Sequence, residues 1–209
     1  ETAMPYNTLG WNRIRYSMYA PIYDGVAWVL SQGRKQAIEA LDLQPHEHVL
    51  IVGAGTGLDL EVLQPGQTIT AMDVSPAMLR RLVHRAQRLD HNVNVYCGDA
   101  ERIALPTGSV DCVLLHCIVA VVPNPEACIQ EAARVVKPGG RISIFDKFVP
   151  AGQHPTFFRR MMNQLTETGF SSITRQLEPL LETASLQVVA HRPAAINGVF
   201  TATIAQPTT

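Results

Sequence analysis

The sequence predicts an α/β protein whose mostly parallel sheet is doubly wound, with helices on both faces. From Val49 onward, short runs rich in β-branched residues alternate with segments of helical periodicity. The first such run, HVLIV at 48–52, passes directly into the glycine-rich stretch GAGTG at 53–57, where the chain can turn sharply into a helix. With 209 residues, 46% of them hydrophobic, the chain can bury a core in one compact domain.

The strands and helices follow from the same alternation. Strands are expected at the β-rich runs 48–52, 68–73, 92–99, 109–117, 141–146, 186–191 and 199–205. Helices are expected near 57–63, at 75–88, at 125–136 and at 172–184. Ser75 can cap the second helix and Pro76 suits its first turn, whereas KPGG at 137–140 should stop the third. The turn-like PAAING at 193–198 makes the last two strands antiparallel neighbours.

Two regions are expected along the chain. Residues 1–45 read as a helical N-terminal cap, because the pattern at 22–41 places apolar side chains on one face. Residues 46–209 carry the alternating strands and helices and form the main domain.

Composition excludes several classes of function. The net charge of −1 offers no electrostatic footprint for nucleic acid. No stretch reaches the roughly 18 apolar residues of a membrane span, and the N-terminus has no signal-peptide run. The four cysteines lack C-x-x-C spacing and read as reduced thiols of a cytoplasmic protein. His46 and His48 stand at the far end of the first strand without acidic or thiol partners, so we expect no metal site.

The glycines and two later strand ends indicate a nucleoside ligand. The pattern is G-x-G-x-G, and Leu58 stands where a dinucleotide fingerprint needs its third glycine. Asp73 ends the second strand, where its carboxylate can accept hydrogen bonds from ribose hydroxyls. Asp99 ends the third strand and can accept the adenine amino proton, while Ala100 offers its backbone N–H to the ring. A nicotinamide-binding oxidoreductase is the alternative that Leu58 disfavours.

The segments VLIVGAGTG, AMDVSPAML, GDAERIALPTGSVDCVL and ARVVKPGGRISIFD resemble the ordered motifs of the class I S-adenosylmethionine-dependent methyltransferases. The resemblance covers about 45–205. It implies a Rossmann-like, seven-stranded sheet with an antiparallel last strand and S-adenosyl-L-methionine lying over the glycine loop. It also implies a set of cofactor-binding residues: Gly53, Ala54, Gly55, Thr56, Asp73, Val74, Met78, Asp99, Ala100 and His116. Tyr16, in the N-terminal cap, is a further cofactor-binding candidate.

Within that set the resemblance implies particular roles. Asp73 would hold the ribose, Val74 and Met78 would pack on the adenine edge, and His116 would line the reactive end of the cofactor. One position departs from the family. Ile51 stands two residues before the first glycine, where members usually carry Glu or Asp. We expect weaker cofactor affinity or a substituted contact.

The methyl acceptor follows from a narrower resemblance. YAPIYDGVAWVLSQGRKQAIEAL, VGAGTGLDLEVL and CIVAVVPNPEACIQEAARVVKPGGRISIFD are similar to the small bacterial phosphatidylethanolamine N-methyltransferases. This implies N-methylation of phosphatidylethanolamine or a related amine, and peripheral contact with the inner membrane face. A soluble small-molecule acceptor (O-, S- or N-) and a non-catalytic cofactor-binding protein are the alternatives. The segment DKFVPAGQHPTFFRRMMNQL departs from the ending that is common in the family.

Candidate acceptor-side residues lie in the cap and at two strand ends. Tyr23 and His116 are the catalytic candidates, since a tyrosine can hydrogen-bond the acceptor or hold a methylated ammonium and imidazole can take a proton near neutral pH. The substrate candidates are Tyr19, Asp146, Lys147 and Arg160.

Membrane contact is expected at two places. One is the N-terminal segment, and the other runs from Phe157 to Met162, where basic and apolar residues mix. A lid over the substrate pocket and a dimer contact are the other interpretations of these segments. The oligomeric state is left open.

Overall fold

The computed structural model describes residues 10, 30–148, 176–196 and 198–208. The elements of this part, in chain order, are α2 (Ser31–Glu39), β1 (His48–Val52), η2 (Leu58–Glu61), β2 (Thr68–Asp73), α3 (Pro76–Arg88), β3 (Val93–Cys97), β4 (Val110–His116), α4 (Pro125–Val135), β5 (Val136–Lys147), α6 (Glu178–Thr183), β6 (Leu186–Ala195) and β7 (Phe200–Pro207). Here η2 denotes a short 3₁₀ helix.

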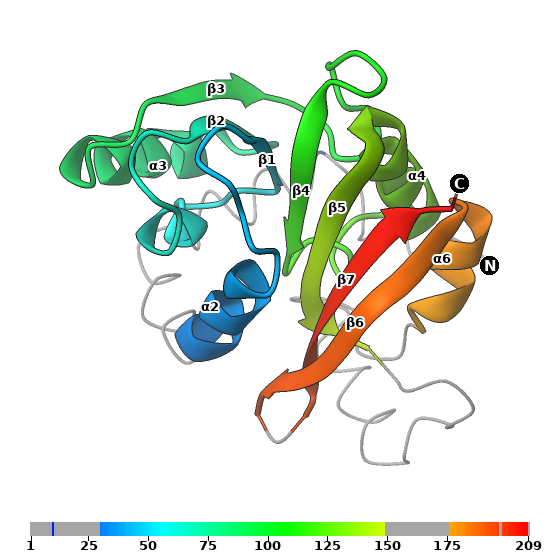
Figure 1. Ribbon diagram of the computed structural model, residues 1–209. Coiled ribbons are helices and arrows are strands. Elements are labelled where there is room, and N and C mark those ends of the chain that lie inside the picture. The colour runs from blue at the N-terminus through cyan, green and yellow to red at the C-terminus, as the bar shows by residue number, and fades with distance from the viewer. Residues whose placement is uncertain (1–9, 11–29, 149–175, 197, 209) are drawn as a thin grey trace.

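Seven strands form one sheet in the order β3-β2-β1-β4-β5-β7-β6 (Figure 1). The neighbours among β1 to β5 pair in parallel, whereas β7 runs antiparallel to both β5 and β6. The doubly wound, seven-stranded class is therefore confirmed, as is the antiparallel pairing of the last two strands. The strand order reverses between β1 and β4, and in such sheets ligands bind beyond the carboxyl ends of the strands at this point.

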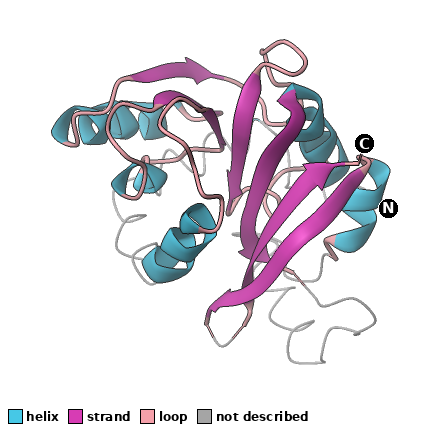
Figure 2. Ribbon diagram, viewed as in Figure 1, coloured by secondary structure: helices cyan, strands magenta, loops and turns pink. Residues whose placement is uncertain are grey.

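Helices cover both faces of the sheet (Figure 2). The alternating side chains of β1 show this division: Val49 and Ile51 pack with residues of α2 and α3. Leu50 and Val52 pack on the other face with residues of α4 and α6. Because successive side chains of a strand point to opposite faces, a strand buried on both sides is apolar throughout, as HVLIV nearly is.

Helices α3 and α4 begin where the sequence places them, and each has a capped N-terminus. The Ser75 side chain accepts a 3.4 Å hydrogen bond from the Met78 N–H, and α3 starts at Pro76. Asn124 does the same for α4 by accepting from the Ala127 N–H at 3.0 Å. These side chains satisfy N–H groups that the first turn of a helix leaves unpaired.

The fifth strand begins earlier than the sequence predicts. The sequence predicts that KPGG separates a helix from a strand, yet β5 already starts at Val136, which pairs with Val110. The next pair is Cys112 with Arg141, so the intervening residues of β5 form an irregularity in the ladder. Gly139 adopts a φ of +76°, and a Cβ at Gly140 would lie 2.6 Å from the Asp111 carbonyl oxygen. The two glycines thus let the extra residues bulge out without ending the strand.

Two other elements differ from expectation. The segment expected as a helix at 57–63 is only the single turn η2, because Gly57 precedes it at a φ of +82° and Pro65 and Gly66 follow closely. Conversely, β6 continues past 191 and through Pro193. This is tolerated because β6 is an edge strand, where a missing N–H need not break a ladder.

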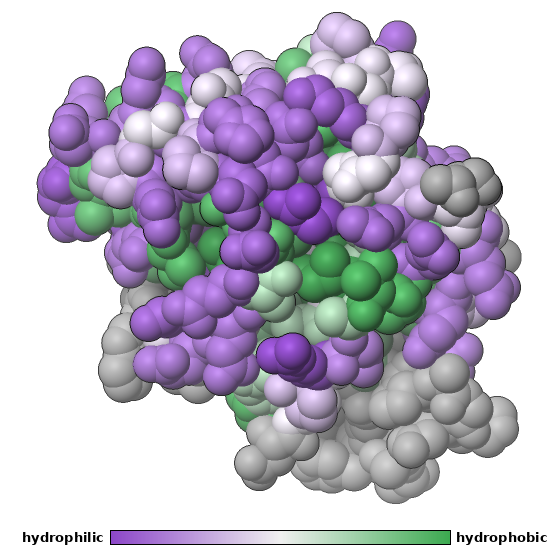
Figure 3. All heavy atoms as spheres, viewed as in Figure 1, coloured by the Kyte–Doolittle hydropathy of each residue, from purple (hydrophilic) through white to green (hydrophobic). Residues whose placement is uncertain are grey.

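The outer surface of β6 is partly apolar. Val188 and Val189 are 49% and 56% exposed, and Figure 3 shows apolar surface over β7 and β6 on a mostly hydrophilic face. Ladder irregularities at 188–190 and at 193–195 interrupt this edge, a feature that discourages pairing with a further strand.

Helix α2 is the described part of the predicted cap, and it packs against β5, β6, β7 and η2. The close approach depends on Gly33, because a Cβ there would lie 2.8 Å from the Phe145 ring. Within the described residues, no helix is long and apolar enough to cross a bilayer.

Candidate functional site

A pocket of about 640 Å³, open in part to solvent, lies at the carboxyl ends of β1 to β4. This is the position expected for a small-molecule site in a doubly wound sheet. Its lining residues are Gly53, Gly55, Met72, Asp73, Val74, Met78, Gly98, Asp99, Ala100, Cys117, Ile118, Val121, Val122 and Pro123. Seven of the predicted cofactor-binding residues are among them: Gly53, Gly55, Asp73, Val74, Met78, Asp99 and Ala100.

The glycine loop forms one wall of this pocket. Gly53, Gly55 and Gly57 have φ angles of +66°, +55° and +82°, in the left-handed region that glycine enters without strain. A Cβ at Gly53 would lie 2.6 Å from the Ile118 side chain, so a larger residue would fill the space between the loop and the opposite wall. The loop therefore needs glycine both for its turn and for the open space beside it.

Asp73 ties the loop to the start of α3. Its Oδ2 accepts the Gly55 N–H at 2.9 Å and its Oδ1 accepts the Ser75 N–H at 2.8 Å. Burial raises the pKa of this carboxyl, although the two N–H groups favour its ionised form. Asp73 lines the pocket with carboxylate oxygens, each of which has more than one lone pair, so they can accept further hydrogen bonds.

Asp99 and Ala100 lie just beyond β3, in the part of the chain that leaves the sheet. Asp99 Oδ1 accepts the Glu101 N–H at 2.9 Å, which fixes the carboxylate at the pocket wall. Gly98 before it is required by close packing, because a Cβ would lie 2.8 Å from the Tyr96 ring. The strand ends at Cys97, so these groups belong to a loop rather than to the strand predicted at 92–99.

Ala54 and Thr56, also predicted to bind the cofactor, do not line the pocket but stand behind it. The Ala54 N–H donates to the Met72 carbonyl at 2.9 Å. Thr56 is buried, and Arg85 Nη1 donates to its carbonyl and to its Oγ1 at 2.7 and 3.0 Å. These contacts hold the loop in shape from the side away from the pocket.

The segment after β4 supplies a wall that sequence reasoning missed. Cys117, Ile118, Val121 and Val122 line the pocket, and the signal for them was the apolar run CIVAVVP directly after a strand. Cys117 has a φ of +59°, and its N–H donates to the Phe145 carbonyl at 2.8 Å. Burial raises the pKa of the Cys117 thiol to about 12, so the thiol stays protonated at neutral pH.

The structure contradicts the prediction that His116 lines the reactive end of the pocket and acts as a base. Its ring is buried, with Nδ1 2.6 Å from Asp59 Oδ1 and Nε2 3.0 Å from Ser143 Oγ. Because a carboxylate only accepts, Nδ1 carries a proton and donates to Asp59. The side chain points to the α2 face of the sheet, and both ring nitrogens are already engaged away from the pocket. Ser143 is also buried, so this Ser-His-Asp arrangement offers no access to a substrate.

The structure also contradicts the prediction that Asp146 contacts the substrate. Its carboxylate is 1% exposed and accepts the Ala120 N–H at 2.9 Å through Oδ2 and the Lys147 N–H at 2.9 Å through Oδ1. It therefore anchors the β4–α4 loop rather than meeting a substrate. Lys147 does not line the pocket, and its Nζ lies 5.9 Å from the Phe200 ring centroid.

Ile51, the departure from the family pattern, is fully buried in an apolar cluster with Val49, Leu60 and Leu114. On the same face of the sheet, the buried carboxylate behind the glycine loop comes from Asp59 of η2.

Several predicted residues lie outside the described part of the chain. These are Tyr16, Tyr19, Tyr23, Arg160 and the segment 157–162. Of the two histidines before β1, His48 places Nε2 2.8 Å from Thr70 Oγ1. Across residues 30–148, 176–196 and 198–208, no group of three or more His, Cys, Asp and Glu side chains could hold a metal ion.

Comparison with known proteins identifies the family. Residues 50–144 match the family described as "Methyltransferase domain". The chain is 31% identical over 159 residues to a phosphatidylethanolamine N-methyltransferase of Cereibacter sphaeroides, covering 73% of this chain and 76% of that protein. The chain belongs to the class I S-adenosylmethionine-dependent methyltransferases.

Other relatives carry different names. The chain is 31% identical over 153 residues to a demethylmenaquinone methyltransferase of Tropheryma whipplei, covering 70% of this chain and 63% of that protein. The chain spans 31% to 63% of the length of the first curated relatives it matches.

Among solved structures, the [4+2]-cyclase SpnF superposes with a TM-score of 0.79 at 17% identity, covering both chains completely. At this level of identity the likeness concerns the methyltransferase fold alone. Cofactor use by this chain follows from the family, whose methyl donor is S-adenosylmethionine.

Proposed function

We propose that the protein transfers a methyl group from S-adenosylmethionine to the amine nitrogen of phosphatidylethanolamine or a closely related amine. The observation that carries this proposal is the likeness to the phosphatidylethanolamine N-methyltransferase, which extends over 76% of that relative. The pocket at the carboxyl ends of β1 to β4 supplies the residue types that such a cofactor needs.

In this proposal the pocket binds the nucleoside through the ends of β2 and β3. Asp73 accepts hydrogen bonds from the ribose hydroxyls. Asp99 accepts a hydrogen bond from the adenine amino group, and the Ala100 N–H donates one to the ring. Val74 and Met78 pack against the ring. Gly53 and Gly55 let the main chain approach the remainder of the cofactor, with the space beside Gly53 kept open by the lack of a Cβ.

Bound S-adenosylmethionine supplies an electrophilic methyl group, and the chain's own residues orient the reactants and exclude water. Ile118, Val121 and Val122 form an apolar wall beside the loop. Burial in such surroundings disfavours a charged ammonium and favours the neutral amine, which is the nucleophilic form. Both nitrogens of His116 are engaged elsewhere, so we assign no histidine base. The ammonium instead releases its proton to bulk water as it leaves solvent, and the neutral amine enters the pocket.

The acceptor side of the proposal involves residues outside the described part. Tyr19, Tyr23 and Arg160 are proposed to contact the headgroup, and Tyr16 the cofactor. The N-terminal segment and the segment 157–162 are proposed to touch the cytoplasmic face of a membrane, since both mix basic and apolar residues.

A soluble acceptor is the second candidate. It is favoured by an arsenite methyltransferase of Halobacterium salinarum, a relative named for a small water-soluble substrate, to which this chain is 26% identical over 180 residues. A non-catalytic role is the third. In that role the chain binds the cofactor without transferring its methyl group.

The test is transfer of labelled methyl from S-adenosylmethionine to phosphatidylethanolamine liposomes, beside a panel of soluble amines, thiols and phenols. We expect label in the lipid phase, and its loss in the Asp73→Ala variant. Label in a soluble acceptor alone would replace the lipid proposal with the second candidate. Binding of S-adenosylhomocysteine without transfer to any acceptor would favour the third.

A further inference from the structure

A buried ionic cluster stands directly behind the pocket, on the α2 face of the sheet. We call Arg34, Asp59 and His116 the Arg34 cluster. Arg34 Nη1 lies 2.8 Å from Asp59 Oδ1, and His116 Nδ1 lies 2.6 Å from the same oxygen. The three side chains are 6%, 3% and 0% exposed, respectively. Removing charges from water to this extent is costly unless they are paired closely, as these are.

The cluster joins four elements that surround the cofactor loop. Arg34 comes from α2, Asp59 from η2 and His116 from β4, and His116 also contacts Ser143 of β5. Asp59 follows Gly57 by two residues, so its contacts fix the end of the glycine loop. His116 directly precedes Cys117 of the pocket wall, and Arg34 Nη2 lies 4.0 Å from the Cys117 Sγ.

The Arg34 cluster lies behind the side of the pocket that β1 and β4 form. Asp73, Asp99 and Ala100, proposed to hold the nucleoside, come from β2 and from beyond β3. Gly53 follows β1 and Cys117 follows β4. In the sheet, β1 and β4 lie on the side of β2 that is away from β3. A cofactor whose nucleoside lies over β2 and β3 therefore directs its amino-acid end toward β1 and β4, where the Arg34 cluster supports the wall.

We propose that Arg34 and Asp59 are positioning residues that hold the glycine loop and the Cys117 wall in the shape that accepts the amino-acid end of the cofactor. Three left-handed glycines in five residues make a loop that is costly to order, and the cluster orders it before the cofactor arrives. Because Arg34 belongs to α2, docking of this helix and binding of the cofactor stabilise each other. This inference rests on the proposed cofactor orientation.

The test compares two ligands by titration calorimetry. S-adenosylhomocysteine carries the amino-acid end, whereas 5′-methylthioadenosine shares the nucleoside and the sulfur but lacks that end. We expect Arg34→Met and Asp59→Asn to weaken binding of S-adenosylhomocysteine by about tenfold or more, the scale for disturbing hydrogen bonds to a charged group. Binding of 5′-methylthioadenosine should change by less than about twofold, since its partners lie away from the altered sites. Arg34→Lys keeps the charge and should give an intermediate loss.

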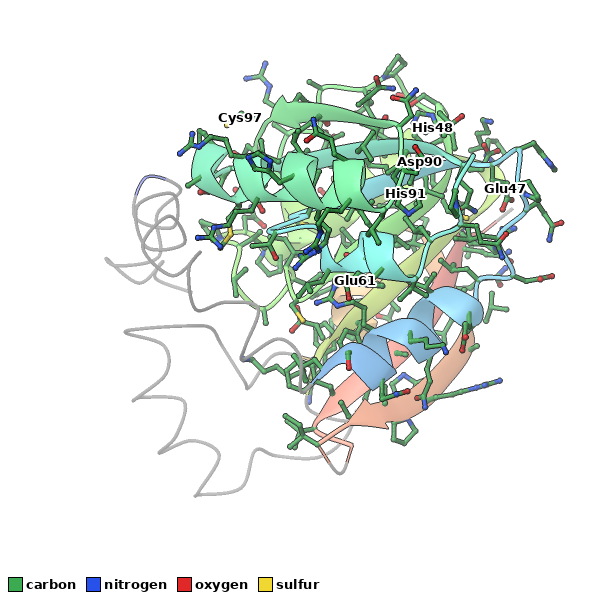
Figure 4. All side chains as sticks on the ribbon, turned by 90° about the vertical axis from the view of Figure 1, so that its left-hand side faces the viewer. Glu47, His48, Glu61, Asp90, His91 and Cys97 are labelled. Carbon is green, nitrogen blue, oxygen red and sulfur yellow. The ribbon has the colours of Figure 1, made fainter. Side chains whose placement is uncertain are left out.

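A matched control is Arg141→Met. Arg141 Nη2 pairs with Glu47 Oε2 at 2.6 Å, but this pair stands beside the amino ends of β1 and β4, away from the pocket. Figure 4 shows Glu47 and His48 at one end of the sheet and Cys97 at the other. The control should lower stability and leave the affinities for both ligands unchanged.

The outcomes separate the inference from the function on which it rests. Unchanged affinity for S-adenosylhomocysteine in the Arg34 variants, or an equal loss for both ligands, would overturn the inference. Circular dichroism establishes that each variant is folded at the titration temperature, and Arg34→Lys decides the matter if Arg34→Met is not. Failure of the unaltered protein to bind S-adenosylhomocysteine would instead overturn the proposed function.

Discussion

At the scale of single residues, Asp73 does more than end a strand. Its two carboxylate oxygens accept the N–H groups of Gly55 and Ser75, so one side chain connects the glycine loop with the N-terminus of α3. The same carboxylate lines the pocket. Its loss should therefore loosen the loop and remove acceptors for a ribose together.

We predict that Asp73→Ala weakens binding of S-adenosylhomocysteine by about 1.5–3 kcal/mol, roughly 10- to 150-fold, because hydrogen bonds to a charged group are lost. Titration calorimetry measures the change. The control is Asp111→Ala, which removes a carboxylate paired with Lys137 at the amino end of β4 and should not alter affinity. Equal affinity of Asp73→Ala and the unaltered protein would show that the ribose is held elsewhere.

His116 and Asp146 show what residue-level reasoning from sequence misses. Both stand at the carboxyl end of a strand, where functional groups of such sheets gather, and this position predicts a role in the site. The sequence does not say toward which face a strand-end side chain points, or which partners it meets there. Asp59 and Ala120 are distant in sequence, and their contacts with the two side chains form only when the chain folds.

At the scale of elements, the docking of α2 depends on a residue without a side chain. Gly33 faces the Phe145 ring and the Ala194 carbonyl, so α2 approaches β5 and β6 closely and brings Arg34 to Asp59. Glycine in a helix normally costs about 1 kcal/mol relative to alanine. Close packing is the reason that it is retained here.

We predict that Gly33→Ala destabilises the protein, because a Cβ would lie 2.8 Å from Phe145 Cε2 and 3.0 Å from the Ala194 carbonyl oxygen. Overpacking of this kind costs about 1–3 kcal/mol, which exceeds the gain of about 1 kcal/mol in helix propensity. Urea unfolding measures the difference. Gln32→Ala, at an exposed position of α2, is the control and should change stability little. A stabilised Gly33→Ala variant would contradict the packing argument.

At the scale of the whole molecule, the two ends of the sheet differ: ion pairs lie at the amino ends of the strands, and the pocket lies at the carboxyl ends. Ion pairs at the amino ends, Glu47 with Arg141 and Asp111 with Lys137, join neighbouring segments without facing the pocket. The carboxyl ends carry the pocket and the buried charges behind it. Burial alone would raise the pKa of the Asp59 carboxyl, but Arg34 and His116 outweigh it and hold that pKa well below its usual value.

We predict that this carboxylate makes the fold sensitive to acid. The pKa of Asp59 is lower in the folded than in the unfolded chain, so its stabilising contribution is complete above about pH 4 and is lost as the pH falls further. Asp59→Asn should cost about 3 kcal/mol at neutral pH, since it leaves the Arg34 charge buried without its carboxylate. Urea unfolding between pH 7 and pH 3 should show this difference shrinking below about pH 4. Asp73, whose pKa is raised, is common to both proteins and cancels in the comparison. A difference that stays constant with pH would contradict the assignment.

The sequence by itself determined the fold class and the part of the pocket wall that the glycine loop and the ends of β2 and β3 supply. Apolar runs ending in glycine or aspartate define β1 and β2, and the cap Ser75 places the start of α3, because such signals act over a few residues. The groups that line the pocket from these strand ends follow from the same local order.

Only the tertiary structure decided what lies behind that wall. The bulge that extends β5 through KPGG depends on pairing with β4, and the Arg34 cluster depends on α2, η2 and β4 meeting on one face. These are contacts between segments that are separated by up to 83 residues, as for Arg34 and Cys117. No local pattern encodes such a contact, because it exists only once the sheet has brought the segments together.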